Sequence, residues 1–237
     1  MTTQSTNRTL RVMAGLAVRG AFEGGIVPAF EAAGGVKVEV EWMPTTVIMA
    51  KVAAGARADV LVVIADAMDR LVQRGAVDPD SRVEVAHSRL GLAVPHGADH
   101  PDIGTVAAFT RALLAARSVA YSKAGASGIY FEKLIETLGI ADAVRAKATV
   151  IPAGFTAEKL VTGEADLAVQ QMSELMVVPT VEIVGKFPEA VQQVSSFSAA
   201  VMRGTANKAA AGSFVASLIG EQAAAAYRAS GVDPANG

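Results

Sequence analysis

The stretch Y-S-K-A-G-A-S-G-I-Y-F-E-K-L-I-E-T-L-G-I, from Tyr121 to Ile140, joins a strand pattern to a helix pattern. An apolar run ends at Tyr121, and apolar residues at helical spacing begin at Tyr130. The turn between them, Gly125–Gly128, contains only glycine, alanine and serine. A small-residue turn at the start of a helix exposes backbone N–H groups and the positive end of the helix dipole, and both suit an anion.

Two interpretations of this turn are open from the sequence. Ser127 stands where an N-cap residue would stand, so the turn could simply start a plain helix. Alternatively, its N–H groups and the Ser127 hydroxyl hold an anionic ligand. A Walker-type phosphate loop is excluded, because no Gly-Lys-Ser/Thr follows the first glycine.

The first third of the chain alternates strand and helix patterns. Strands are predicted at Leu10–Met13, Val36–Trp42 and Asp59–Ile64, and the third is a continuous apolar run typical of a strand buried on both faces. With helical patterns separating them, these strands predict a βαβαβ unit. Functional loops in such sheets follow the carboxyl ends of the strands. Here those loops are residues 14–20, 42–46 and 65–67.

The rest of the chain shows a second series of strands and helices. Strands are predicted at Val83–Val94 with a break at His87–Arg89, and at Ser118–Tyr121, Ala148–Ile151, Leu167–Val169, Val181–Val184 and Gln193–Val201. Helices are predicted at Val106–Leu114 and Thr156–Val161, and as one alanine-rich helix from Asn207.

These patterns predict an α/β protein of two Rossmann-like lobes joined by two crossing strands. Lobe 1 would comprise residues 8–88 and 193–237, lobe 2 residues 89–192, and residues 1–7 a disordered leader. A cleft between the two lobes is the expected ligand site.

Composition excludes several functional classes. The chain has 237 residues, a net charge of −2, no cysteine and three histidines. The charge argues against a nucleic-acid surface, and the lack of cysteine rules out disulfides and thiolate metal sites. The histidines are too few and too scattered to indicate zinc, so neither a metal nor a cofactor is expected. No apolar run is long enough for a membrane span.

The first residues, M-T-T-Q-S-T-N, lack the apolar segment of a secretory signal. We therefore expect a cytoplasmic protein as the sequence is written, or a periplasmic one if the sequence is a trimmed mature form.

Four short motifs carry a resemblance to a known family: Gly55–Val60, Gly125–Gly128, Gly163–Asp166 and Gln171–Glu174. Their order and spacing resemble the type 2 periplasmic-binding-protein family, in particular its molybdate-binding-protein-like branch. The resemblance implies two α/β lobes, hinged by two crossing strands, that close over a small oxyanion or carboxylate. Some members of this branch are similar to aconitate isomerase, which moves a double bond in a tricarboxylate without a cofactor.

The sequence departs from the family pattern at several site positions. The serine of the first loop is replaced within Gly15–Ala17, and Thr45 stands where a second serine is usual. Gln170, Gln171 and Glu174 replace the usual tyrosine and aspartate. These changes argue against a tetrahedral metal oxyanion as the ligand.

The first functional hypothesis is a binding protein for a small carboxylate or oxyanion. Arginine forks, hydroxyls and free N–H groups are the donors that such a ligand needs. Arg19 could equally be a solvated helix start, and Arg89 a structural residue of the crossing. The predicted ligand-binding residues are Leu16, Ala17, Arg19, Thr45, Thr46, Arg89, Ala126, Ser127, Gly128, Gln171 and Ser173.

The second hypothesis is a cofactor-free isomerase of an unsaturated polycarboxylate. Proton abstraction beside a carboxylate needs a base and donors for the developing negative charge. Glu174 and Tyr130 are the candidate catalytic residues, with Lys123 and His87 as weaker candidates for the base. Glu174 could equally cap the following segment, and Tyr130 could simply pack.

Partner expectations follow from the two hypotheses. An exported binding protein would serve an ABC permease, whereas a cytoplasmic one would be an enzyme or a sensor. A transcription regulator is disfavoured, because no basic helix-turn-helix precedes Leu10.

Overall fold

The computed structural model describes residues 9–34 and 36–236. The predicted leader, residues 1–7, lies outside the described residues. The chain divides into two compact units. Unit 1 comprises residues 1–87, 196–229 and 233–237, and unit 2 comprises residues 88–195 and 230–232. None of the helices in the described part of the chain has the length and apolar character needed to cross a membrane.

Unit 1 is built on a mostly parallel sheet. Strand β1 (Thr9–Ala14) pairs in parallel with β2 (Lys37–Trp42) and β3 (Val60–Ile64), and β9 (Val194–Val201) runs antiparallel to β3. The first three strands confirm the predicted patterns. The buried strand β3 is apolar throughout, whereas the edge strand β2 alternates charged with apolar residues. The difference arises because β3 is buried on both faces of the sheet, whereas β2 has one exposed face.

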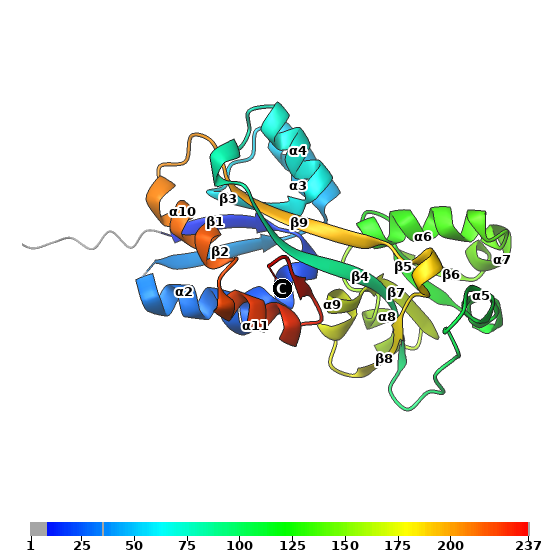
Figure 1. The fold of residues 1–237 in the computed structure, drawn as a ribbon. Helices are drawn as coiled ribbons and strands as arrows, with labels where there is room; N and C mark the ends of the chain where they lie inside the picture. Colours follow the sequence, from blue (N-terminus) through cyan, green and yellow to red (C-terminus); the bar gives the residue numbers. More distant parts are fainter. Residues whose placement is uncertain (1–8, 35, 237) are drawn as a thin grey trace, which may run out of the picture. The chain divides into compact units, whose positions relative to one another are not determined.

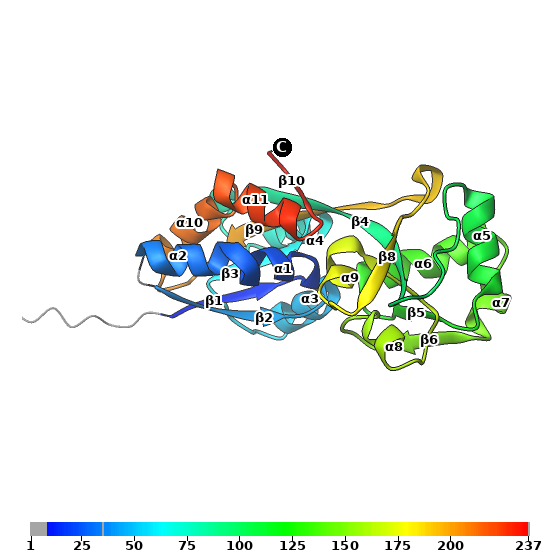
Figure 2. The ribbon, with the colours of Figure 1, turned by 90° about the horizontal axis from the view of Figure 1, so that it is seen from below.

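Helices cover both faces of the unit 1 sheet. On one face lie α3 (Thr45–Ala53) and α4 (Ala65–Gln73), whose apolar residues join the strands in one buried cluster. The other face carries the remaining helices, several of which Figure 2 shows in front of the sheet. They are η1 (Leu16–Val18), α1 (Arg19–Ala21), η2 (Phe22–Ile26), α2 (Val27–Gly34), α10 (Lys208–Ser217) and α11 (Glu221–Ala229).

An aromatic cluster joins α10 to the N-terminal helices of unit 1. The ring of Phe214 lies 5.9 Å from Phe22 and 5.0 Å from Phe30, and Phe22 meets Trp42 edge-on at 5.7 Å. The predicted single C-terminal helix is wrong, because the chain breaks at residues 218–220 into α10 and α11. The break lets both Phe214 and Tyr227 be buried.

Unit 2 repeats the plan with a second sheet. Strand β5 (Val119–Ser122) is parallel to β6 (Ala148–Ile151) and β7 (Leu167–Gln171). Strand β4 (Val83–Pro95) runs antiparallel to β7 and to β8 (Val181–Lys186). The helices are α5 (Val106–Ala115), α6 (Ala126–Thr137), α7 (Ala141–Arg145), α8 (Glu158–Val161) and α9 (Met172–Met176). Two 3-10 turns, η3 (Pro79–Ser81) in unit 1 and η4 (Glu189–Val191) in unit 2, and the short β10 (Asp233–Pro234), which pairs with β4, complete the elements.

The predicted break in the strand at His87–Arg89 is wrong. β4 runs unbroken from Val83 to Pro95. Its polar residues are accommodated within the strand, because Ser88 is buried and the Nδ1 atom of His87 lies 3.0 Å from the Ser196 hydroxyl. The short helices α7 and α9 carry little periodic signal and were not predicted.

Each unit contains an aspartate that accepts a backbone hydrogen bond from the neighbouring strand or the residues just before it. In unit 1, a carboxylate oxygen of Asp59 accepts the N–H of Arg11 at 2.7 Å. In unit 2, Asp166 accepts the N–H of Arg117 at 2.8 Å. Each aspartate directly precedes a buried parallel strand, so each carboxylate fixes the start of that strand against its neighbour.

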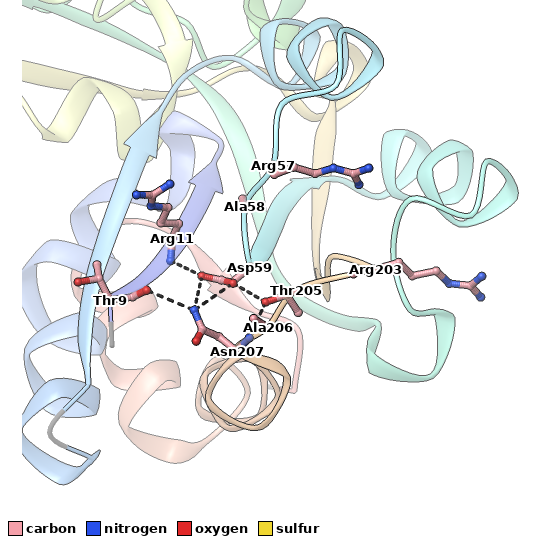
Figure 3. Close-up of a pocket in the computed structure, with 10 residues that line it drawn as sticks. Thr9, Arg11, Arg57, Ala58, Asp59, Arg203, Thr205, Ala206 and Asn207 are labelled. Carbon is pink, nitrogen blue, oxygen red and sulfur yellow. Dashed lines mark hydrogen bonds between the residues drawn. The ribbon is translucent and has the colours of Figure 1, made fainter. Parts of the chain in front are cut away.

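Asp59 also binds the segment that leads into α10. Its carboxylate accepts the hydroxyl of Thr205 and the side-chain amide of Asn207, as the dashed lines in Figure 3 show. The side chain is buried. One carboxylate therefore joins β1, β3 and the β9–α10 connection.

We predict that Asp59→Ala lowers the free energy of unfolding by about 2–4 kcal/mol, because it leaves several donors without their charged acceptor. Denaturant titration measures the loss. The matched control is Asp99→Ala, which removes an exposed carboxylate and should change stability by less than about 0.5 kcal/mol. Equal stability of the two variants would contradict the role assigned to Asp59.

Candidate functional site

In unit 2, the chain leaves two neighbouring parallel strands toward opposite faces of the sheet. After β5 it enters α6, whose Phe131, Leu134 and Ile135 join the cluster on one face. After β7 it enters α9, whose Leu175 joins the cluster on the other face. Figure 1 shows the two helices on either side of this sheet. Such a switch point opens a crevice at the carboxyl ends of the strands, where ligands of α/β sheets bind.

We call this place the β5–β7 edge, and define it by Ser122, residues 125–128 and residues 171–174. It contains five of the ligand-binding residues and one catalytic candidate that the sequence predicts. They are Ala126, Ser127, Gly128, Gln171, Ser173 and Glu174.

The first turn of α6 forms one wall of the edge. Its N-cap residue is Gly125, in extended conformation, and no side chain caps the helix. The prediction of Ser127 as N-cap is therefore wrong. Ser127 is buried in the second helical position instead. The N–H groups of Ala126, Ser127 and Gly128 have no acceptor within the helix.

Gly128 brings this turn against the end of β5. A Cβ atom at position 128 would lie 1.6 Å from the carbonyl oxygen of Ser122. Backbone atoms cannot move aside as a flexible side chain can, so only glycine fits there. The helix N-terminus is thus held directly over the last residue of the strand.

The Ser122 hydroxyl lies inside this contact. The residue is 2% exposed, and its Oγ atom has no hydrogen-bond partner among residues 9–34 and 36–236. A Cβ atom at Gly125 would lie 2.4 Å from that Oγ and 3.7 Å from the Ser127 Oγ. A side chain at position 125 would therefore press against the Ser122 hydroxyl, so glycine at this position lets that hydroxyl lie against the start of α6.

Gln171 ends the neighbouring strand with a second buried polar group. Its amide nitrogen donates to the Ser195 hydroxyl at 2.9 Å. Its carbonyl oxygen, Oε1, is buried and has no donor in the described part of the chain. Close by, the hydroxyls of Ser173 and Ser88 lie 3.5 Å apart.

Glu174 is buried at the third position of α9. Its carboxyl group accepts the backbone N–H of Gln171, the N-cap residue, and a hydrogen bond from the Gln170 side chain. Burial raises the pKa of Glu174 to about 8, although both hydrogen bonds act to lower it. The carboxyl is therefore mostly protonated and neutral near pH 7. The first of these bonds is half of a capping box, so the capping role considered from sequence is present.

Gln170 links Glu174 to the loop that follows β6. Its carbonyl oxygen accepts the N–H of Thr156 at 2.8 Å and the Thr156 hydroxyl at 3.0 Å. Its amide nitrogen donates to the carbonyl of Gly154 at 2.8 Å. Gln170 thus joins the carboxyl end of β7 to the loop after β6 and to Glu174 on α9.

The residues predicted in unit 1 gather at the corresponding edge of its sheet. Leu16 and Ala17 are buried in η1, directly after β1. Thr45 begins α3, and its hydroxyl accepts the N–H of Ile64 at the end of β3 at 3.3 Å. Thr46 follows in the same helical turn. Arg19 forms an exposed ion pair with Glu23 at 2.9 Å, consistent with the solvated helix start considered from sequence.

The remaining candidate residues in and near unit 2 lie outside the β5–β7 edge. The Tyr130 hydroxyl donates to the carbonyl of Val191 at 3.0 Å, so this residue packs and bonds within unit 2. Arg89 is half-buried on β4. Lys123 is exposed, and His87 bonds to Ser196.

Two pockets lie elsewhere in the described residues, and neither contains a predicted ligand-binding residue. A 640 Å³ pocket in unit 1 surrounds Asp59, whose carboxylate is already bonded to protein donors (Figure 3). A 490 Å³ pocket in unit 2 lies between Tyr121, Lys123 and Val150. Across the described ranges, no group of histidines and carboxylates is arranged to hold a metal ion.

Sequence reasoning missed Ser122 and Ser195. Ser122 carried a usable signal, because it is the hydroxyl residue that closes an apolar strand just before the small-residue turn. Ser195 carried none, since its contact with Gln171 joins residues far apart in the chain.

Comparison with known proteins places these features in a family. The family described as bacterial extracellular solute-binding protein matches residues 10–233. An aconitate isomerase from Pseudomonas sp is 36% identical over 215 residues, which cover 88% of this chain and 82% of that protein.

Solved structures agree with the predicted fold. The periplasmic molybdate-binding protein of Azotobacter vinelandii superposes with a TM-score of 0.80 at 21% identity, covering 94% of this chain and 98% of that one. The sulfate-binding protein of Mycobacterium tuberculosis gives a TM-score of 0.76 at 18% identity, covering 97% and 88%. The predicted type 2 periplasmic-binding-protein fold is thereby confirmed.

The raised pKa of Glu174 predicts a pH dependence of stability. Below about pH 4.5 the group is protonated in both the folded and the unfolded state, so it has no destabilising effect there. As the pH rises from about 4.5 to about 8, the unfolded state ionises while the folded state keeps its proton. The free energy of unfolding then falls by at most about 1.4 kcal/mol per pH unit.

Glu174→Gln removes the titrating group while keeping its shape. We expect this variant to gain stability relative to the unaltered protein as the pH rises from 5 to 8, by about 2 kcal/mol or more in total. Denaturant titrations of both proteins at each pH give the difference. A difference that does not change with pH would show that Glu174 is ionised in the folded protein.

Proposed function

The chain belongs to the family of bacterial extracellular solute-binding proteins, and we propose that it binds a small polycarboxylate at the β5–β7 edge. The observation that carries the proposal is the buried, unpartnered hydroxyl of Ser122 beside the uncapped N-terminus of α6. A hydroxyl in that position lacks an acceptor, and a carboxylate oxygen supplies one.

The chemistry of this wall of the edge favours negative charge. The first-turn N–H groups of α6, the Ser122 hydroxyl and the Ser127 hydroxyl can all donate. A helix N-terminus adds a favourable dipole. Because burial raises the pKa of Glu174 to about 8, that carboxyl is largely uncharged near pH 7 and does not repel an anion.

Several observations favour a carboxylate over a tetrahedral metal oxyanion. A protein 36% identical across most of this chain is an aconitate isomerase. In addition, Leu16 and Ala17 offer no hydroxyl at the end of β1. Arg89, half-buried in unit 2, is the cation that we propose for a further carboxylate of the ligand.

Within unit 1, the predicted residues form a separate proposed set of anion donors. These are the N–H groups of Leu16 and Ala17, the hydroxyls of Thr45 and Thr46, and Arg19. They stand at the carboxyl ends of β1, β2 and β3, the place in an α/β sheet where ligand-binding loops lie.

Isomerisation of an unsaturated polycarboxylate is the second candidate function, favoured by the aconitate isomerase relative. Moving a double bond requires that a proton be taken from one carbon and given to another. Glu174 is the group of the edge whose pKa, about 8, lies near neutrality, which suits proton transfer. Tyr130 is a weaker choice, because its hydroxyl is bonded to Val191 and burial raises its pKa.

We propose an ABC permease as a partner only for an exported form of the protein, in which the chain would deliver its ligand. A form that stays inside the cell would act as an enzyme or a sensor.

The binding proposal is tested by a thermal-shift screen against molybdate, tungstate, sulfate, citrate, cis-aconitate and trans-aconitate. A ligand at 100 times its dissociation constant stabilises the folded state by about 2.7 kcal/mol, which raises the melting temperature measurably. We expect the polycarboxylates to raise it and the tetrahedral oxyanions to leave it unchanged. A response to the oxyanions alone would overturn the choice of carboxylate.

We predict that Ser122→Ala weakens binding of the best ligand from that screen by roughly tenfold or more, because a hydrogen bond to a charged group is lost. The stability of the free protein should stay the same or rise slightly, because an unsatisfied buried hydroxyl is removed. Isothermal titration calorimetry and denaturant titration give the two quantities.

The matched control is Ser118→Ala, just before the other end of β5. The Ser118 hydroxyl lies 2.8 Å from that of Thr149, so its loss should lower stability by about 1 kcal/mol and leave affinity unchanged. If Ser122→Ala and the unaltered protein bind the ligand with equal affinity, Ser122 does not contact the ligand.

The isomerase candidate is tested by following cis- and trans-aconitate by proton NMR in deuterated water. Interconversion that is lost in Glu174→Gln, with binding retained, would support it. Binding of aconitate without interconversion or deuterium incorporation would contradict the isomerase function and leave ligand binding as the supported function.

A further inference from the structure

Gln171 carries the second buried and unsatisfied polar atom of the β5–β7 edge, and this atom is an acceptor. The side chain is 2% exposed, with its amide nitrogen held by the Ser195 hydroxyl at 2.9 Å. The remaining atom, Oε1, has no donor from the described residues. Leaving a buried acceptor without a donor costs about 1–3 kcal/mol.

A hydrogen-bond acceptor does not suit a site whose ligand is a fully ionised anion. Carboxylate and oxyanion oxygens only accept hydrogen bonds, so they repel an amide oxygen. An unpaired polar group of this kind selects against ligands that cannot satisfy it. The N–H groups of α6 and the Ser122 hydroxyl fit the charged part of a ligand, whereas Gln171 fits a different part.

The two positions are close enough for one small molecule. β5 and β7 are hydrogen-bonded neighbours with Ala120 opposite Ala168, so Gln171 lies one residue beyond the position level with Ser122. Val169, two residues before Gln171, packs in the same cluster as Phe131 of α6, so the Gln171 side chain lies on the face of the sheet that α6 covers. Neighbouring strands lie about 4.8 Å apart. A ligand whose carboxylate lies on the first turn of α6 therefore needs to reach only to the end of the next strand for a second polar group to meet Gln171.

We infer that the ligand of this site carries a hydroxyl group that donates to Oε1 of Gln171 while a carboxylate binds at the N-terminus of α6. The substrate class is therefore a hydroxy polycarboxylate, and this inference rests on the proposed function. A hydroxyl fits better than an ammonium group, because the amide oxygen is neutral and Glu174, with a pKa of about 8, is mostly uncharged at pH 7.

The test compares ligands that differ in one hydroxyl. Citrate and tricarballylate carry the same three carboxylates, and malate and succinate the same two, but only the first of each pair has a hydroxyl. Calorimetric titration of the unaltered protein should give at least tenfold tighter binding for each hydroxylated member. Equal affinities within a pair would overturn the inference.

Gln171→Met tests the assignment to this residue, because methionine is of similar length and lacks the acceptor. We expect the preference for the hydroxylated ligands to fall to within about twofold, while the carboxylates still bind. The control is Gln193→Met at an exposed position, which should keep the full preference. A preference that survives in Gln171→Met would assign the hydroxyl to another residue.

The possible failures are distinguishable. If none of the four ligands binds, the proposed function fails, whereas equal binding within each pair refutes only the hydroxyl. The comparison in the unaltered protein decides this even if Gln171→Met does not fold.

Discussion

The contact between Gly128 and the end of β5 is the constraint on which the candidate site depends. Because any Cβ at this position would lie 1.6 Å from the Ser122 carbonyl oxygen, the first turn of α6 can sit directly on the strand only with glycine there. This contact aims an uncapped helix N-terminus at the carboxyl edge of the sheet and encloses the Ser122 hydroxyl beside it. Without a ligand, these unsatisfied donors cost free energy, and an anion that accepts their hydrogen bonds removes that cost.

Around this contact, unit 2 repeats the plan of unit 1. In both units an aspartate before a buried strand accepts the N–H of a residue at the start of the neighbouring strand, through Asp59 and Asp166. With the strand starts fixed in this way, the carboxyl ends remain available for ligand-binding loops. The buried polar residues Gln170, Gln171 and Glu174 then fix the carboxyl end of β7 by hydrogen bonds to the chain after β6 and to Ser195 in β9.

The sequence predicts the strands and the fold class well, because alternation and apolar runs report burial directly. It fails where a tertiary contact decides the outcome. β4 stays unbroken because Ser88 is buried and His87 is bonded to Ser196. α6 begins at Ala126, with Gly125 as its N-cap, because Gly128 must meet β5. The glycine-rich turn was visible from sequence, as were Gln171 and Glu174. The orphan atoms of Ser122 and Gln171 were not, since only the surroundings of an atom show that it lacks a partner.

The central claim is that a carboxylate sits on the first-turn N–H groups of α6. The most direct measurement is an amide NMR titration of the labelled protein with citrate. The account predicts large downfield shifts for the N–H groups of Ala126, Ser127 and Gly128, because each would gain a charge-assisted hydrogen bond. Saturation with citrate while these three resonances stay unmoved would contradict the account, because the anion would then bind elsewhere.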